Sequence, residues 1–196
     1  MSCLETTAET SHRCEDLIAV FNACFQESHN TVLIGGAEEP LYQVADQDHP
    51  HHRIYFTQDY YASGLHEIAH WLVAGEARRQ QEDYGYWYAP DGRSLEQQAE
   101  FEKVEARPQA LECILSRAAG FPFRVSADNA EAGLMPSAEF CQRIYQELQA
   151  YCQGRLNERS VTLIAALSAF YGTSCSDDSG LPPACDVSSY TLEDVR

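Results

Sequence analysis

The stretch between Ala62 and Arg79 repeats apolar residues at the spacing of an α-helix, and this pattern sets the first condition on the fold. The residues on the repeating face are Leu65, Ile68, Ala69, Leu72 and Val73. Apolar positions three and four residues apart share one face of a helix, and that face has to be covered by other parts of the chain. The pattern therefore predicts a long helix, from about residue 62 to residue 79, that packs into the core.

Other segments with clear periodicity complete the expected fold. Helices are predicted over about 12–25, 94–106, 137–153 and 158–171, and short strands over Thr31–Ile34 and Arg53–Phe56. Ser94 and Gln97 have the spacing of a capping box, and Pro108 either kinks the helix that they begin or starts a new one. The expected fold class is α+β: a helix-rich single domain with a small β-sheet and the 62–79 helix at its centre.

The chain of 196 residues is long enough for one domain. We expect an acidic leader over residues 1–11, one folded domain over 12–171 and a partly ordered tail, rich in Ser, Asp and Pro, over 172–196. The first residues lack the basic and apolar regions of a signal peptide, and the longest apolar run, near Leu163, is too short to cross a bilayer. A cytoplasmic protein with reduced cysteines is therefore expected.

The charge of the chain excludes some partners. Thirty acidic residues against 13 basic ones give a formal net charge of −17. A duplex phosphate backbone would be repelled by that charge, and clusters of lysine and arginine that recruit anionic lipids are missing. We therefore expect neither nucleic acid nor a membrane as a direct partner.

Within the predicted 62–79 helix lies the sequence His66-Glu67-Ile68-Ala69-His70, an HExxH motif. Residues four apart lie on one face of a helix, one turn from each other, so two imidazoles can reach the same metal ion from a rigid support. Neutral imidazole nitrogens, which histidine supplies near pH 7, are good ligands for divalent metals. Glu67 can reach a metal-bound water without being a ligand itself.

Two histidines leave a metal site incomplete, and a third ligand is expected from a second element. The helix predicted over 94–106 offers Glu100, Glu102 and Glu105, and Glu112 follows beyond Pro108. Glu105 is our first choice because it lies just before the break predicted at Pro108, where the chain is held rigidly; Glu102 is the second. The alternative for any of these residues is a solvated acidic face, which a chain of this charge would readily form.

Three further histidines are less suitable as ligands, because they lie in a polar connection where surface positions are usual: His49, His51 and His52. A set of two histidines and one carboxylate is compatible with zinc, which would make Glu67 the general base of a peptidase. It is equally compatible with iron(II), which activates dioxygen. A non-catalytic module that holds a structural metal, or none, is the third reading, and spacing alone does not choose between them.

Further blocks of sequence surround the HExxH motif and form a recognisable set. They are Phe21-Asn22, Cys24-Phe25, Tyr60 to Trp71, Gly75 to Arg79, Tyr84 to Tyr88, Pro90 to Arg93, Phe101 to Glu105, Pro108 to Leu111 and Ala118 to Asn129. In these blocks the sequence resembles the bacterial elongation factor P hydroxylase family. The resemblance covers about residues 12–171 and leaves out the leader and the tail.

The resemblance implies a non-heme iron(II) oxygenase that uses dioxygen to hydroxylate a lysine of elongation factor P. That lysine usually carries an added β-lysyl group. By position, His66 and His70 would bind the metal and Glu105 would complete the site, with Glu67 as a catalytic or orienting group. The family does not look like the 2-oxoglutarate oxygenases, so the electron donor stays open. The aromatic residues at 84–88 could form the wall of a pocket for the aliphatic part of the lysine.

Overall fold

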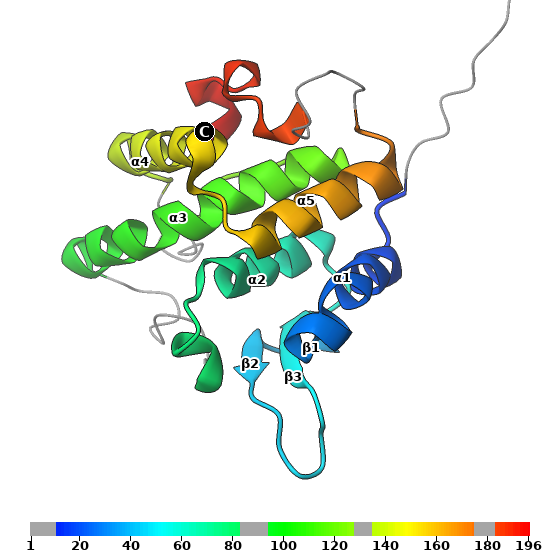
Figure 1. Cartoon of the computed structure of the whole chain (residues 1–196). Helices are drawn as coiled ribbons and strands as arrows, with labels where there is room; N and C mark the ends of the chain where they lie inside the picture. Colours follow the sequence, from blue (N-terminus) through cyan, green and yellow to red (C-terminus); the bar gives the residue numbers. More distant parts are fainter. Residues whose placement is uncertain (1–10, 83–93, 128–134, 175–182) are drawn as a thin grey trace, which may run out of the picture.

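The computed structural model describes residues 11–82, 94–127, 135–174 and 183–196 (Figure 1). The prediction of a helix-rich α+β fold with a small sheet is confirmed. The main elements are α1 (Cys14–His29), β1 (Thr31–Ala37), β2 (Leu41–Gln43), β3 (His52–Thr57), α2 (Tyr61–Val73), α3 (Leu95–Ala119), α4 (Ala138–Ala150) and α5 (Glu158–Tyr171). The expected aromatic wall at residues 84–88 lies outside the described ranges.

Three strands form the sheet in the order β1-β3-β2, with β3 parallel to β1 and antiparallel to β2. β1 continues past Ile34, where it was expected to end, because the register shifts between Ile34 and Ala37 and Gly36 takes up a φ of 82°. The short strand β2 was not predicted, since three residues carry too little periodicity to be recognised.

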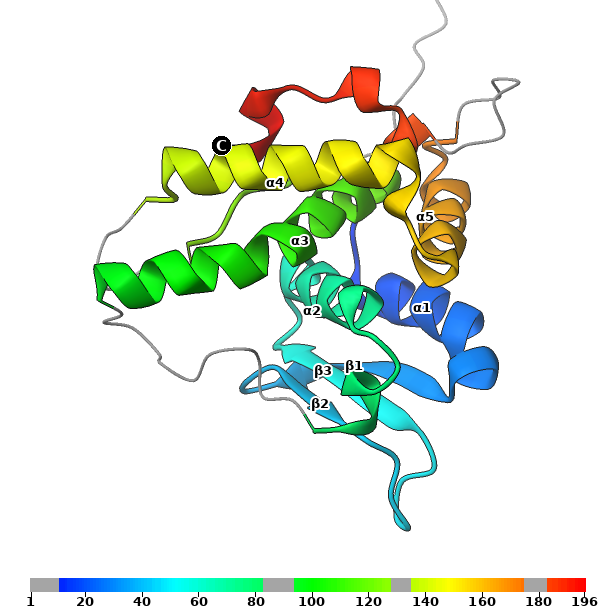
Figure 2. The ribbon, with the colours of Figure 1, turned by 60° about the vertical axis from the view of Figure 1, so that its left-hand side comes forward.

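Helix α2 lies between the sheet and α3, with α1 beside it on the same side of the sheet (Figure 2). The close approach of α2 to α1 and β3 depends on Gly64. A Cβ atom at that position would lie 2.8 Å from Leu17 of α1 and 3.6 Å from the ring of Phe56 of β3. Burial on this side fixes the rotation of α2, so the two histidines of its motif turn toward α3.

The prediction that this helix reaches Arg79 was wrong: α2 ends at Val73, and Arg78–Gln80 form a separate turn of 3-10 helix. The last carbonyl groups of α2 accept hydrogen bonds from side chains of the α5 region. Arg159 donates to the carbonyls of Trp71, Leu72 and Ala74, and Asn157 also donates to Leu72. These donors take the place of the backbone N–H groups that a longer helix would supply.

Helix α3 begins as predicted and ends later. Ser94 and Gln97 form the expected capping box, but the helix continues through Pro108 to Ala119, where Gly120 adopts the left-handed conformation. Pro108 therefore does not end the helix near residue 106 or start a new one. One continuous helix therefore places residues from both sides of the proline, such as Glu105 and Glu112, on the same buried face.

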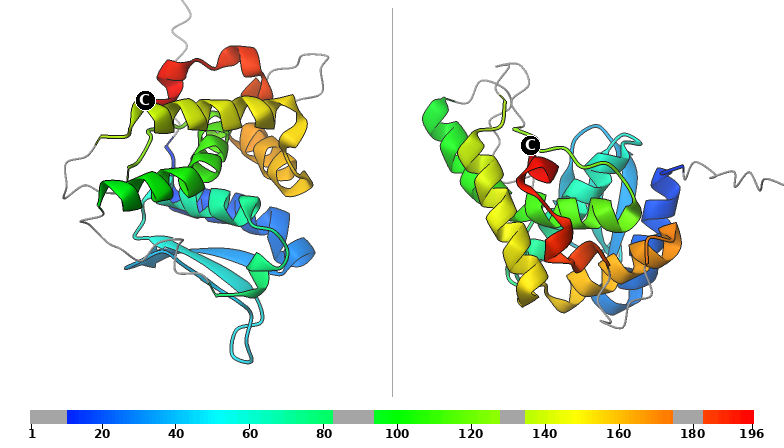
Figure 3. Two further views of the ribbon diagram at one scale, coloured as in Figure 1. Left: turned by 90° about the vertical axis from the view of Figure 1, so that its left-hand side faces the viewer. Right: turned by 90° about the horizontal axis from the view of Figure 1, so that it is seen from above.

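The helices predicted over 137–153 and 158–171 correspond to α4, with the turn Tyr151–Arg155 after it, and to α5. The described part of the tail, residues 183–196, forms three short 3-10 helices that pack against α3 and α4 (Figure 3). Tyr190 and Val195 are buried there, and Asp194 pairs with Arg117 of α3 at 3.0 Å. None of the helices in the described ranges is long and apolar enough to cross a bilayer.

Candidate metal centre

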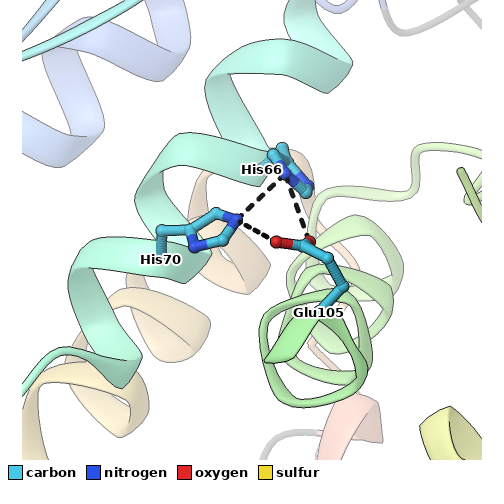
Figure 4. Close-up of side chains that lie close together, drawn as sticks. All are labelled: His66, His70 and Glu105. Atoms are coloured by element: carbon cyan, nitrogen blue, oxygen red, sulfur yellow. Dashed lines mark hydrogen bonds and ion pairs between the residues drawn. The ribbon is translucent and has the colours of Figure 1, made fainter. Parts of the chain in front are cut away.

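The structure brings His66 and His70 of α2 together with Glu105 of α3 (Figure 4). The two Nε2 atoms of the histidines lie 3.0 Å apart. Glu105 places Oε1 at 3.4 Å from Nε2 of His70 and Oε2 at 3.7 Å from Nε2 of His66. The carboxylate is almost fully buried, at 4% exposure of its side chain, whereas about a quarter of each imidazole reaches solvent.

The donor set and its spacing fit one divalent metal ion. Donor atoms about 2.1 Å from a shared cation, and about 90–120° apart around it, are separated by roughly 3.0–3.6 Å, close to the three distances here. Oε2 of Glu105 is buried without a hydrogen-bond partner among the described residues, which is costly for a carboxylate oxygen unless a cation satisfies it. Two imidazoles and one carboxylate suit zinc, iron and related metals alike.

The side chains of this cluster hold opposite charges close together. Burial opposes the charge of His66, but the carboxylates of Glu112 and Glu105 outweigh it and raise its pKa to about 10. The pKa of His70 is raised as well, because Glu105 outweighs the effect of burial. Burial acts against the charge of Glu105 too, yet the two histidines lower its pKa to about 2. Glu105 is therefore an ionised carboxylate across the neutral range.

Glu67 lies beside this cluster in the wall of a cavity of about 390 Å³, which His70 and Trp71 also line. Burial raises the pKa of the Glu67 carboxyl, although the charges of the two histidines oppose the shift. Its side chain is not part of the group of possible ligands. The arrangement therefore suits a group that holds or transfers a proton next to the cluster.

Of the acidic residues proposed as the third ligand, Glu105 lies beside Nε2 of both histidines, and Glu112 contacts Nδ1 of His66 instead. Glu102 and Glu100 have partners away from the histidines. Glu102 accepts a hydrogen bond of 2.6 Å from the hydroxyl of Ser137, at the start of α4. Glu100 is exposed and pairs with Lys103. The sequence favoured Glu105 over Glu102 because Glu105 was expected to lie in a rigid part of the chain. The structure distinguishes the two residues by their neighbours, since Glu105 faces α2 and Glu102 faces α4.

The three histidines judged less suitable lie at the sheet, away from the cluster. His49 contacts Asp46 at 3.1 Å, the Nδ1 atom of His51 lies 2.7 Å from the side-chain oxygen of Asn30, and His52 accepts from the backbone of Ala45.

Two buried polar residues of α3, Glu112 and Gln109, have partners that the sequence did not indicate; Glu112 was considered there only as a possible third ligand. Glu112 contacts the Nδ1 atom of His66 at 2.8 Å, and Gln109 exchanges two hydrogen bonds with the backbone of Ser126. The signal was present in the spacing, because Glu105, Gln109 and Glu112 lie four and three residues apart along one helical face. The face could be recognised, but the neighbour of each residue could not.

The fold and the cluster define a class: a helix-rich α+β protein with a candidate His-His-Glu metal centre shared by an HExxH helix and a second helix. The sequence model of the family described as elongation factor P hydroxylase matches residues 20–179. The chain belongs to this family. A relative from Haemophilus influenzae named elongation factor P lysine hydroxylase is 52% identical over 162 residues, which cover 83% of this chain and 91% of the relative.

Proposed function

We propose that this protein is an iron(II)-dependent oxygenase that hydroxylates the β-lysylated lysine of elongation factor P in the cytoplasm. The observation that carries the proposal is the convergence of His66, His70 and Glu105 on one point, in a chain of the elongation factor P hydroxylase family. The name of the Haemophilus influenzae relative supports lysine as the residue that is modified.

Iron(II) bound by this triad would supply the activation of dioxygen that hydroxylation of an unactivated C–H bond requires. His66 and His70 provide nitrogen donors, and Glu105 provides a negative oxygen from a buried position. Glu67 borders the cavity next to His70, where it can hold a proton or orient a water molecule. Reduction of the second oxygen atom to water needs a separate reductant, which this proposal leaves outside the chain.

Intact mass of elongation factor P tests the proposal directly. Co-expression with this protein and with the enzymes that attach β-lysine should add the mass of one oxygen atom to the factor. Co-expression of the His70→Ala variant should not, because the metal would lose one of its two nitrogen ligands. A factor of unchanged mass beside the folded wild-type protein, or a cleaved factor as a zinc peptidase would produce, contradicts the proposal.

Replacement of Glu67 by glutamine should separate catalysis from metal binding. We expect the metal content to stay at the wild-type level, since Glu67 is outside the group of ligands. The rate of hydroxylation should fall by about 10²–10⁴, the usual contribution of a positioned acid or base. Glu76→Gln, at an exposed position beyond the end of α2, is the matched control and should leave both quantities unchanged. A Glu67→Gln variant with wild-type turnover would show that this carboxyl moves no proton in the reaction.

A further inference from the structure

We infer that Glu112 is a positioning residue of the metal site, which fixes the orientation of the His66 imidazole. The inference rests on the proposed function, because it assigns Glu112 a role toward the metal held by His66, His70 and Glu105. It begins from the contact of 2.8 Å between Oε2 of Glu112 and Nδ1 of His66.

The contact determines which nitrogen of His66 carries a proton. An ionised carboxylate can only accept hydrogen bonds, so Nδ1 of His66 must be the donor. A neutral imidazole with its proton on Nδ1 has its lone pair on Nε2. That atom faces Nε2 of His70 and Oε2 of Glu105. The hydrogen bond to Glu112 therefore holds the ring with Nε2, the atom that would bind a metal, directed toward His70 and Glu105.

Burial makes this contact stronger than a surface ion pair. The side chain of Glu112 is 10% exposed, and the imidazole that it contacts is 27% exposed. A carboxylate in such a place cannot be replaced by water as the partner of Nδ1 without opening the space between α2 and α3. Its loss would leave the ring free to rotate or to carry its proton on Nε2, and either change removes a ligand atom from the site.

Helix α3 supplies both the third ligand and the orienting carboxylate. Glu105 and Glu112 are seven residues apart, which places them on the same face of the helix, two turns from each other. This requires α3 to continue through Pro108, as the structure shows.

The two histidines do not have equivalent surroundings. Within the described residues, His70 contacts His66 and Glu105 through its Nε2 atom, whereas His66 has a carboxylate at Nδ1 as well.

Metal affinity distinguishes a positioning role from a merely structural one. Co²⁺ is a suitable probe, because its visible spectrum reports ligand geometry and its affinity can be measured by competition with a chelator. Compared with wild type, Glu112→Leu should bind Co²⁺ about 10–100-fold more weakly, the usual effect of removing a carboxylate that orients a metal-binding histidine. Glu112→Gln should recover most of this affinity, because its amide oxygen still accepts from Nδ1.

The matched control is Glu102→Gln, which alters another buried glutamate of α3, one that contacts Ser137. It should keep the wild-type affinity and spectrum even if its thermal stability falls. Equal Co²⁺ affinity and equal spectra in wild type, Glu112→Gln and Glu112→Leu would overturn the role of Glu112 and leave the proposed function intact. A folded wild-type protein that binds no Co²⁺ would instead overturn the metal site itself.

Discussion

Replacement of Glu105 by glutamine is expected to abolish tight metal binding and, with it, hydroxylation of elongation factor P. The substitution keeps the shape of the side chain but removes the negative charge from a buried position that faces His66 and His70. A neutral amide is a much poorer metal ligand than a carboxylate. Loss of a residue that only orients a ligand lowers metal affinity by up to roughly 100-fold, and the loss of a ligand itself should lower it further. His66→Ala and His70→Ala should have the same effect.

The measurement is the metal content of protein purified without oxygen, together with the intact mass of elongation factor P. Glu102→Gln is the control, because it lies on the same helix three residues away and is also buried. It should retain metal and activity, with a loss of stability of about 1 kcal/mol through its weaker contact with Ser137. Retention of metal by Glu105→Gln and its loss by Glu102→Gln would reverse the assignment.

Replacement of Arg159 by methionine should lower the free energy of unfolding by about 2–4 kcal/mol, because three hydrogen bonds from one charged guanidinium are lost at once. The guanidinium donates to the carbonyls of Trp71, Leu72 and Ala74 at 2.9–3.1 Å and lies 4.5 Å from the centre of the Trp71 ring. Burial, followed by the charge of Arg79, lowers the pKa of Arg159 to about 10. Both effects disfavour the charged guanidinium at this position, and its hydrogen bonds offset that cost.

In a domain of this size the change corresponds to a fall in Tm of roughly 4–16 °C, which calorimetry would record. Arg155→Met is the control: this arginine is half exposed and pairs with Glu147 at 3.1 Å, a contact worth about 1 kcal/mol or less. Because Arg159 holds the end of the helix that carries His70, metal affinity should fall with stability in Arg159→Met. Equal Tm values for the two variants would show that the end of α2 does not depend on these hydrogen bonds.

The two histidines could be assigned to one face from the sequence because their relation is local. Positions four apart in a helix are neighbours whatever the rest of the chain does. The capping box of Ser94 and Gln97 was predicted for the same reason, since both partners lie within one turn. The end of α2 was predicted wrongly because the groups that terminate it belong to Asn157 and Arg159, more than eighty residues later in the chain.

By itself, then, the sequence determined the helical character of the chain, the presence of an HExxH helix and a short choice of acidic partners. Tertiary structure decided among those partners: Glu105 faces the histidines, Glu102 accepts from Ser137 at the start of α4, and Glu112 contacts the far nitrogen of His66. The physical reason is the range of the interactions. Periodicity follows from backbone geometry within a few residues, whereas the neighbour of a buried carboxylate depends on how α3 is rotated against α2, and the whole core sets that rotation.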